Sequence, residues 1–131
     1  MIRDHRRAQV AHEHVAEVSG SSDPVRRAYG SHCHKLAVLV HQAGLAAALH
    51  HTMALKDPKP RLVAHLATQL HEAELLSRPD AETLLAAVRQ ADLSETWLLT
   101  REVRRCLEWY RRLAHGVLGV RSAADAPEEA T

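Results

Sequence analysis

The sequence contains no phenylalanine, and aromatic residues make up only 3% of its 131 residues. It has one isoleucine and 11 valines, against 22 alanines and 18 leucines. Sheets are usually covered by β-branched and aromatic side chains, whereas alanine and leucine favour helices. The composition therefore excludes a β-rich protein and predicts an all-α fold. The length fits one domain of ordinary size and disfavours a two-domain enzyme.

Cysteine is scarce, and long apolar runs are missing. The only two thiols, Cys33 and Cys106, are 73 residues apart, and no apolar signal segment precedes them. Such thiols are typical of buried cysteines in the reducing cytoplasm. No run approaches the roughly 18 apolar residues that a membrane span needs. These absences predict a cytoplasmic protein that does not contact a membrane.

Net charge is close to zero, because 17 basic residues face 16 acidic ones. This balance excludes a strongly basic or strongly acidic protein. Its distribution is uneven: residues 1–60 and 93–121 each carry +3, whereas residues 61–92 carry −2 and residues 122–131 carry −3. Most of the basic side chains are arginines, whose planar guanidinium suits phosphate.

Apolar residues recur with helical spacing along most of the chain. This pattern predicts a compact single-domain bundle of five to seven helices in residues 1–121, followed by a flexible acidic tail at residues 122–131. Gly44 stands where a left-handed helix cap is expected, so it should join two helices. The last helix should be the longest, running from about Ser94 to about Gly119 with Val117 on its apolar stripe.

Eleven histidines raise the question of a metal site. Two ligands on one helix need a spacing of three or four residues, and no pair of these histidines has it. The closest group, His32, Cys33 and His34, is too weak to predict a site. The usual catalytic motifs are also missing. The sequence therefore predicts no metal, no cofactor and no enzymatic activity.

The richest pattern lies in the last helix, where Arg101 is followed by further arginines 3, 4, 10 and 11 residues later. These side chains share one face, opposite the apolar stripe, and span about 16 Å. Such a face predicts contacts to the phosphates of a nucleic acid without reading of base sequence. The alternative is a solvated face on which Glu108 pairs with neighbouring arginines. The candidate RNA-binding residues are Arg101, Arg104, Arg105, Arg111 and Arg112.

Two stretches carry a family resemblance. Residues 39–49 read LVHQAGLAAAL, and residues 96–114 read TWLLTREVRRCLEWYRRLA. Both resemble the small, all-helical subunit of the type III-B CRISPR RNA-targeting effector, the Cmr complex. The second stretch matches best, through its Thr-Arg-Glu start and its Leu-Glu-Trp segment. Tyr110 departs from that pattern, because an aliphatic residue is usual there.

The resemblance implies a noncatalytic role in antiviral defence. Small subunits of this kind stack along the effector filament and help to hold crRNA and target RNA, so the implied partners are other subunits and the RNA phosphate backbone. Glu102 and Glu108 would be intrahelical or intersubunit ion-pair partners. The candidate interface or core anchors are Trp97, Trp109, Tyr110, Gly44 and Leu45.

Two other classes of protein stay open. A small helical DNA-binding regulator would need a helix-turn-helix with a polar recognition helix. The only close helix junction, at Gly44, is flanked by segments rich in leucine and alanine. A metal- or thiol-dependent enzyme would need titratable side chains that converge in the fold.

Overall fold

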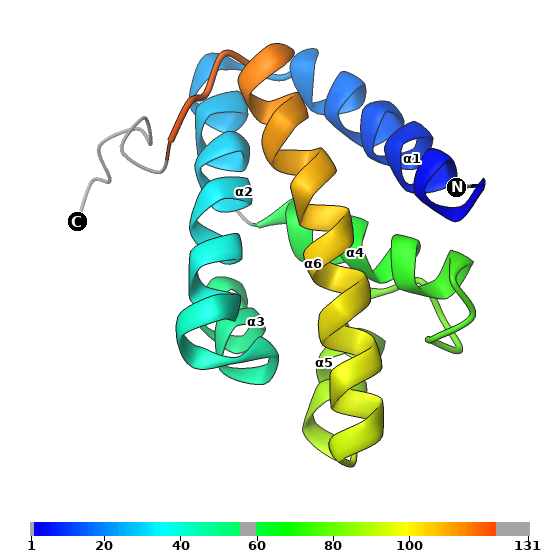
Figure 1. Ribbon diagram of the computed structural model, residues 1–131. Coiled ribbons are helices and arrows are strands. Elements are labelled where there is room, and N and C mark those ends of the chain that lie inside the picture. The colour runs from blue at the N-terminus through cyan, green and yellow to red at the C-terminus, as the bar shows by residue number, and fades with distance from the viewer. Residues whose placement is uncertain (1, 56–59, 123–131) are drawn as a thin grey trace.

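The computed structural model describes residues 2–55 and 60–122, which form six helices and no strand (Figure 1). The prediction of an all-α fold with five to seven helices is confirmed. None of the helices in this described part has the length and hydropathy needed to span a bilayer. The predicted acidic tail lies outside the described residues, apart from Ser122. The helices are α1 (Ile2–Ser19), α2 (Asp23–Ala43), α3 (Leu45–Met53), α4 (Arg61–Glu72), α5 (Ala81–Gln90) and α6 (Leu93–Gly116).

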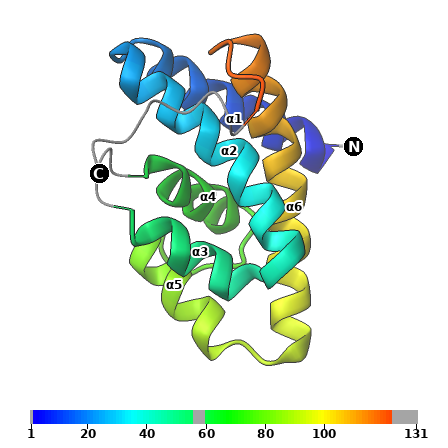
Figure 2. The same ribbon diagram turned by 90° about the vertical axis from the view of Figure 1, so that its left-hand side faces the viewer.

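Helix α4 lies at the centre of the bundle. Figure 2 shows it surrounded by the other helices, and it contacts all five of them. Half of its 12 residues are buried, among them Leu62, Leu66 and Leu70 as the 3.6-residue spacing predicts. Burial of this apolar stripe against the other helices fixes the central place of α4, while its opposite side, with Arg61 and Ala64, stays exposed.

Helix α6 is the longest helix and packs against α1 and α2. Its N-terminus is a capping box: Asp92 accepts a hydrogen bond from the backbone N–H of Glu95 at 2.8 Å, and the Glu95 carboxylate accepts one from the N–H of Asp92 at 3.3 Å. The cap is therefore Asp92, and the helix begins at Leu93, one residue before the predicted start at about Ser94. The buried residues follow the predicted stripe: Leu99, Val103, Cys106, Leu107, Tyr110 and Ala114.

The C-terminal end of α6 differs from the prediction. The helix ends at Gly116, three residues early, and Val117 is 43% exposed instead of lying on the apolar stripe. Beyond it the chain turns back, and the backbone N–H of Val120 donates to the carbonyl of Ala114 at 3.0 Å. Val120 then packs onto Gly30 of α2, so closely that a Cβ at Gly30 would lie 2.5 Å from it. Burial of Val120 against α2 replaces another turn of helix.

Gly44 separates α2 from α3, as predicted. Its N–H donates to the carbonyl of Val40 at 3.1 Å, and its φ is +89°. Its ψ of 164° places it outside the left-handed helical conformation that we expected, in a region open mainly to glycine. Leu45 begins α3 and is buried in the core.

Candidate nucleic-acid interface

Five exposed arginines define the cationic face of α6: Arg101, Arg104, Arg105, Arg111 and Arg112. The helix places them on one side because they recur every three or four residues. None of the five forms an ion pair within 4.0 Å with any residue in 2–55 or 60–122. The guanidinium groups are therefore available to an external anion.

The expected pairs between Glu108 and its neighbouring arginines are not formed within the described residues. Glu108 is nevertheless exposed on the same side of α6. The face therefore carries five guanidinium groups and one carboxylate, and its net charge is strongly positive. This arrangement favours anionic ligands over a self-neutralised, solvated surface.

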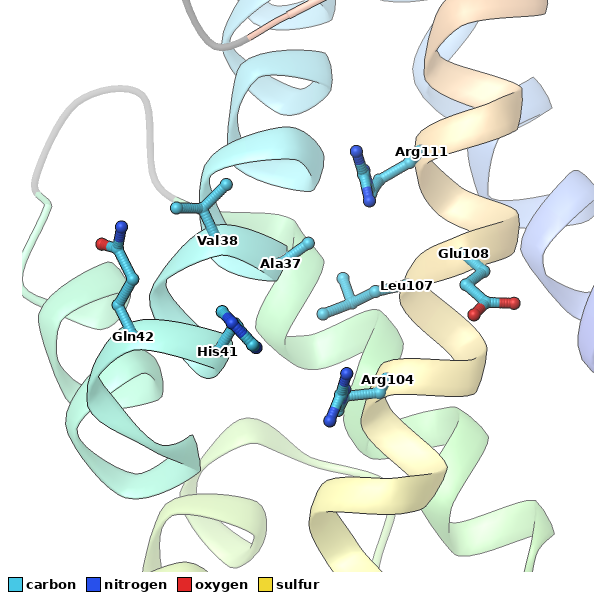
Figure 3. Close-up of a pocket in the computed structure, with 8 residues that line it drawn as sticks. All are labelled: Ala37, Val38, His41, Gln42, Arg104, Leu107, Glu108 and Arg111. Atoms are coloured by element: carbon cyan, nitrogen blue, oxygen red, sulfur yellow. The ribbon is translucent and has the colours of Figure 1, made fainter.

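Two of these arginines border a groove of about 320 Å³ between α2 and α6. Figure 3 shows Arg104 and Arg111 projecting from α6 toward α2, whereas the carboxylate of Glu108 points away from α2. The opposite wall carries His41 and Gln42, near the end of α2. Because the two arginines are seven residues apart, their backbone positions are about 10 Å apart along the helix. Sequence reasoning missed His41 and Gln42, since nothing in their spacing links them to α6.

Arg101 and Arg105 line a second hollow, on the side of α6 that faces α1. Its volume is about 630 Å³, and α1 contributes Arg3, Asp4 and Arg7 to its wall. The predicted arginine face is thus one continuous strip along α6 that borders two grooves. A ligand in either groove meets at least two guanidinium groups.

Two arginines of the face lie over tryptophan rings. The Arg101 guanidinium carbon is 4.8 Å from the ring centroid of Trp97, and that of Arg112 is 5.0 Å from the centroid of Trp109. Both distances are within the range of cation–π attraction. These contacts orient the guanidinium groups without neutralising their charge.

The expected anchors differ in burial. Tyr110 is fully buried and Leu45 nearly so, which places both in the core. Trp109 is half-buried, and its indole N–H donates to Asp4 at 3.1 Å, so it links α6 to α1. Trp97 is 59% exposed and is therefore not a core residue. Gly44 is exposed and serves the helix junction.

Glu102 is neither an intrahelical partner of the cationic face nor a surface group. It is 7% exposed and accepts two hydrogen bonds from Arg7, at 2.6 and 2.9 Å, and a third from Arg3 at 3.1 Å. Burial raises the pKa of Glu102, but the hydrogen bonds and charge of Arg7 outweigh burial and hold the pKa below its usual value. The pair fastens α1 to α6 beneath the second hollow.

The sequence held a signal for this buried pair. Glu102 lies three residues after Leu99 and four before Cys106, so it falls on the apolar stripe of α6. Arg7 occupies the same kind of position before Val10 and Ala11. A charged side chain on a buried stripe requires a partner of opposite charge. The pattern identifies both residues, but only the packing of α1 against α6 pairs them.

Four rings from four helices form a polar cluster in the core. The rings of His14 and His65 stack with centroids 3.9 Å apart. His14 Nδ1 lies 2.7 Å from the hydroxyl of Tyr110, and His65 Nδ1 lies 2.6 Å from that of Tyr29. Burial lowers the pKa of both histidines, and repulsion from His14 in its protonated form and from Arg61 helps to lower that of His65 to about 3. Both rings are neutral at pH 7 and serve as internal hydrogen-bonding groups.

Of the residues considered for thiol or metal chemistry, the two cysteines are buried, whereas His32 and His34 are half-buried. Cys33 and Cys106 are free and buried, and burial raises the pKa of both thiols well above the usual value. In the group around Cys33, His34 Nε2 is 2.9 Å from the carbonyl oxygen of Val120 instead of facing a shared site. Within residues 2–55 and 60–122, no three histidine, cysteine or acidic side chains are arranged to hold a metal ion.

These features define a small helical protein with an arginine-rich, cationic face on its longest helix. The family model described as "CRISPR-associated protein (Cas_Cmr5)" matches residues 3–117. The chain therefore belongs to the Cas_Cmr5 family, which confirms the resemblance inferred from residues 39–49 and 96–114.

One curated relative is the CRISPR system Cmr subunit Cmr5 of Thermus thermophilus. It is 37% identical over 111 residues, which cover 85% of this chain and 91% of the relative. The crystal structure of a CRISPR-associated Cmr5 family protein, also from Thermus thermophilus, superposes with a TM-score of 0.77 at 35% identity. That match covers 88% of this chain and 96% of the other. The six-helix arrangement is thus similar to that of a solved family member.

Proposed function

We propose that this protein is a noncatalytic small subunit of a type III-B CRISPR ribonucleoprotein effector, acting in the cytoplasm in antiviral defence. Membership of the Cas_Cmr5 family supports the assignment. The buried, protonated thiols and the neutral core histidines support a structural role over a catalytic one. Two free thiols also fit a reducing compartment.

In this role the protein stacks along the effector filament beside other subunits and supports crRNA and target RNA. The cationic face is the surface that contacts the RNA phosphate backbone. The observation that carries this proposal is the set of five exposed arginines without ion-pair partners in the described residues. Phosphate contacts of this kind need charge and spacing but no base-reading groups.

The partner assignment is tested by affinity purification of the tagged protein from its own cells, with identification of the bound proteins and RNA. Copurification of effector subunits together with crRNA is the expected result. Recovery of DNA with no other CRISPR subunit would instead support the DNA-binding regulator.

The RNA contact is tested by replacing Arg104, Arg105, Arg111 and Arg112 with Gln. Glutamine is nearly as good a helix former as arginine, so α6 should be retained. The slope of log affinity against log salt should flatten by about 0.7 for each arginine that contacts a phosphate of single-stranded RNA.

A matched control removes four arginines outside the cationic face. All four are exposed: Arg27 lies on α2, Arg61 on α4, Arg78 in the loop before α5 and Arg89 on α5. Their replacement by Gln changes net charge by the same amount and should leave the salt dependence largely intact. Equal RNA retention by complexes carrying either set, at several salt concentrations, would contradict the RNA contact. Loss of complex assembly from the first set alone would assign the face to a protein interface.

A further inference from the structure

An exposed tryptophan begins the cationic face. Trp97 lies one turn into α6 and is 59% exposed, although tryptophan is among the side chains that gain most from burial. Within the described residues its indole N–H donates no hydrogen bond, in contrast to that of Trp109, which donates to Asp4. The core therefore does not account for the large aromatic side chain at this position.

Helical spacing places Trp97 among the arginines. Arg101, Arg104 and Arg105 follow it at four, seven and eight residues, so all four side chains share one face of α6. They line a hollow of about 300 Å³ together with Thr100 and Glu108. Arg101 lies over the indole ring, with its guanidinium carbon 4.8 Å from the ring centroid. The hollow thus combines an accessible aromatic ring with three guanidinium groups.

We infer that Trp97 stacks against an unpaired base of single-stranded RNA, while the phosphates of the same strand lie along Arg101, Arg104 and Arg105. Every base has a π-face, so stacking on an indole tolerates any sequence, whereas a base within a duplex is already stacked and paired. A simple anion leaves the tryptophan without a role, and an apolar ligand leaves the three charges without one. RNA with an exposed base uses both. This inference rests on the RNA contact proposed above and adds a preference for unpaired nucleotides.

The experiment uses the full-length chain carrying Trp109→Phe, in which Trp97 is the only tryptophan. Three probes of equal length are titrated at low ionic strength: single-stranded oligouridylate, the same backbone with abasic positions throughout, and a fully paired RNA duplex. Binding is followed by the anisotropy of a dye on the RNA, and stacking is followed separately by quenching of Trp97 emission.

All three probes should bind through their phosphates, but only the oligouridylate should quench Trp97. In the chain with Trp109 intact, Trp97→Ala should weaken binding of oligouridylate roughly 5-fold to 100-fold, the usual range for loss of one base–aromatic stack. It should leave binding of the abasic probe unchanged. Trp97→Phe should retain most of the affinity, because an aromatic face remains.

The outcomes separate this inference from the proposed function. Binding of all three probes with Trp97 emission unchanged, or quenched equally by the abasic probe, overturns the stacking and leaves the phosphate contact intact. Failure of every probe to bind overturns the RNA contact itself. Emission that changes with protein concentration and not with RNA overturns the stacking in favour of a protein contact at Trp97.

Discussion

Arg7 and Glu102 join the first helix to the last through two hydrogen bonds of 2.6 and 2.9 Å, with both side chains almost fully buried. Three further groups surround the pair: Arg3 donates to Glu102, Cys106 lies 3.4 Å from the same carboxylate, and Asp4 accepts from Arg7. The cationic face lies on the same helix, so this pair holds in place the element on which the proposed function depends.

Removal of one partner should destabilise the protein strongly. Arg7→Met or Glu102→Gln should lower the free energy of unfolding by up to about 3–5 kcal/mol, because the remaining buried charge keeps only a more exposed partner, Arg3 for Glu102 or Asp4 for Arg7. The double variant should lose less than the sum of the two single losses. The stability of all three variants is measured by chemical denaturation, with unfolding monitored by far-UV circular dichroism.

Another ion pair, which joins α1 to α4, provides the matched control. Arg6 also donates two hydrogen bonds to a carboxylate, that of Glu72, at 2.8 and 3.1 Å, but this pair is exposed. Arg6→Met should therefore lower the free energy of unfolding much less than Arg7→Met does. Equal losses at the two pairs would show that burial does not determine the contribution of Arg7.

The stacked histidines should make the protein sensitive to acid. The folded-state pKa of His65 is lowered to about 3, whereas a histidine in the unfolded chain titrates near 6.5. As pH falls below about 6.5 the unfolded state takes up a proton that the folded state excludes. The free energy of unfolding should therefore fall with decreasing pH, by up to about 1.4 kcal/mol per pH unit for this histidine.

Denaturant unfolding between pH 8 and pH 5 tests this dependence. His65→Gln keeps a hydrogen-bonding group near Tyr29 but does not titrate, so it should flatten the decline. His71→Gln, at an exposed position of the same helix, controls for the loss of one histidine. A decline of the same steepness in the His65 variant would exclude His65 as its source.

Gly44→Ala should lower the thermal stability. The φ of +89° disfavours any residue with a Cβ by about 1 kcal/mol or more. Apart from Gly44 and its two chain neighbours, no residue has an atom within 4 Å of the Cβ that would be added, so the loss comes from the backbone alone. Gly116→Ala is the control, since its Cβ also meets open space but its φ is not positive. A melting temperature unchanged in both variants would show that the junction tolerates a side chain.

Removing the one carboxylate of the cationic face should strengthen RNA binding. Glu108→Gln takes away a negative charge that lies between Arg104 and Arg111 along α6, so affinity for single-stranded RNA at low salt should rise a few-fold. Glu82→Gln, at an exposed position of α5, changes net charge equally and should have little effect. Weaker binding by the Glu108 variant would indicate that this carboxylate holds an arginine in position.

The sequence by itself determined the fold class, the helix junction at Gly44 and the existence of the arginine face. Each depends on local rules: alanine and leucine favour helices, glycine alone readily adopts a φ of +89°, and a spacing of three or four residues places side chains on one face. Because these rules act within a few residues of chain, they can be applied before the helices are packed.

Only the tertiary structure decided which helix pairs with which. It brought Arg7 to Glu102 across 95 positions and folded Val120 back onto Gly30, which ended α6 earlier than its own periodicity predicts. It also gathered the rings of His14, Tyr29, His65 and Tyr110 from four helices into one cluster in the core. Burial depends on the elements that cover a residue, and the packing of distant segments supplies those elements.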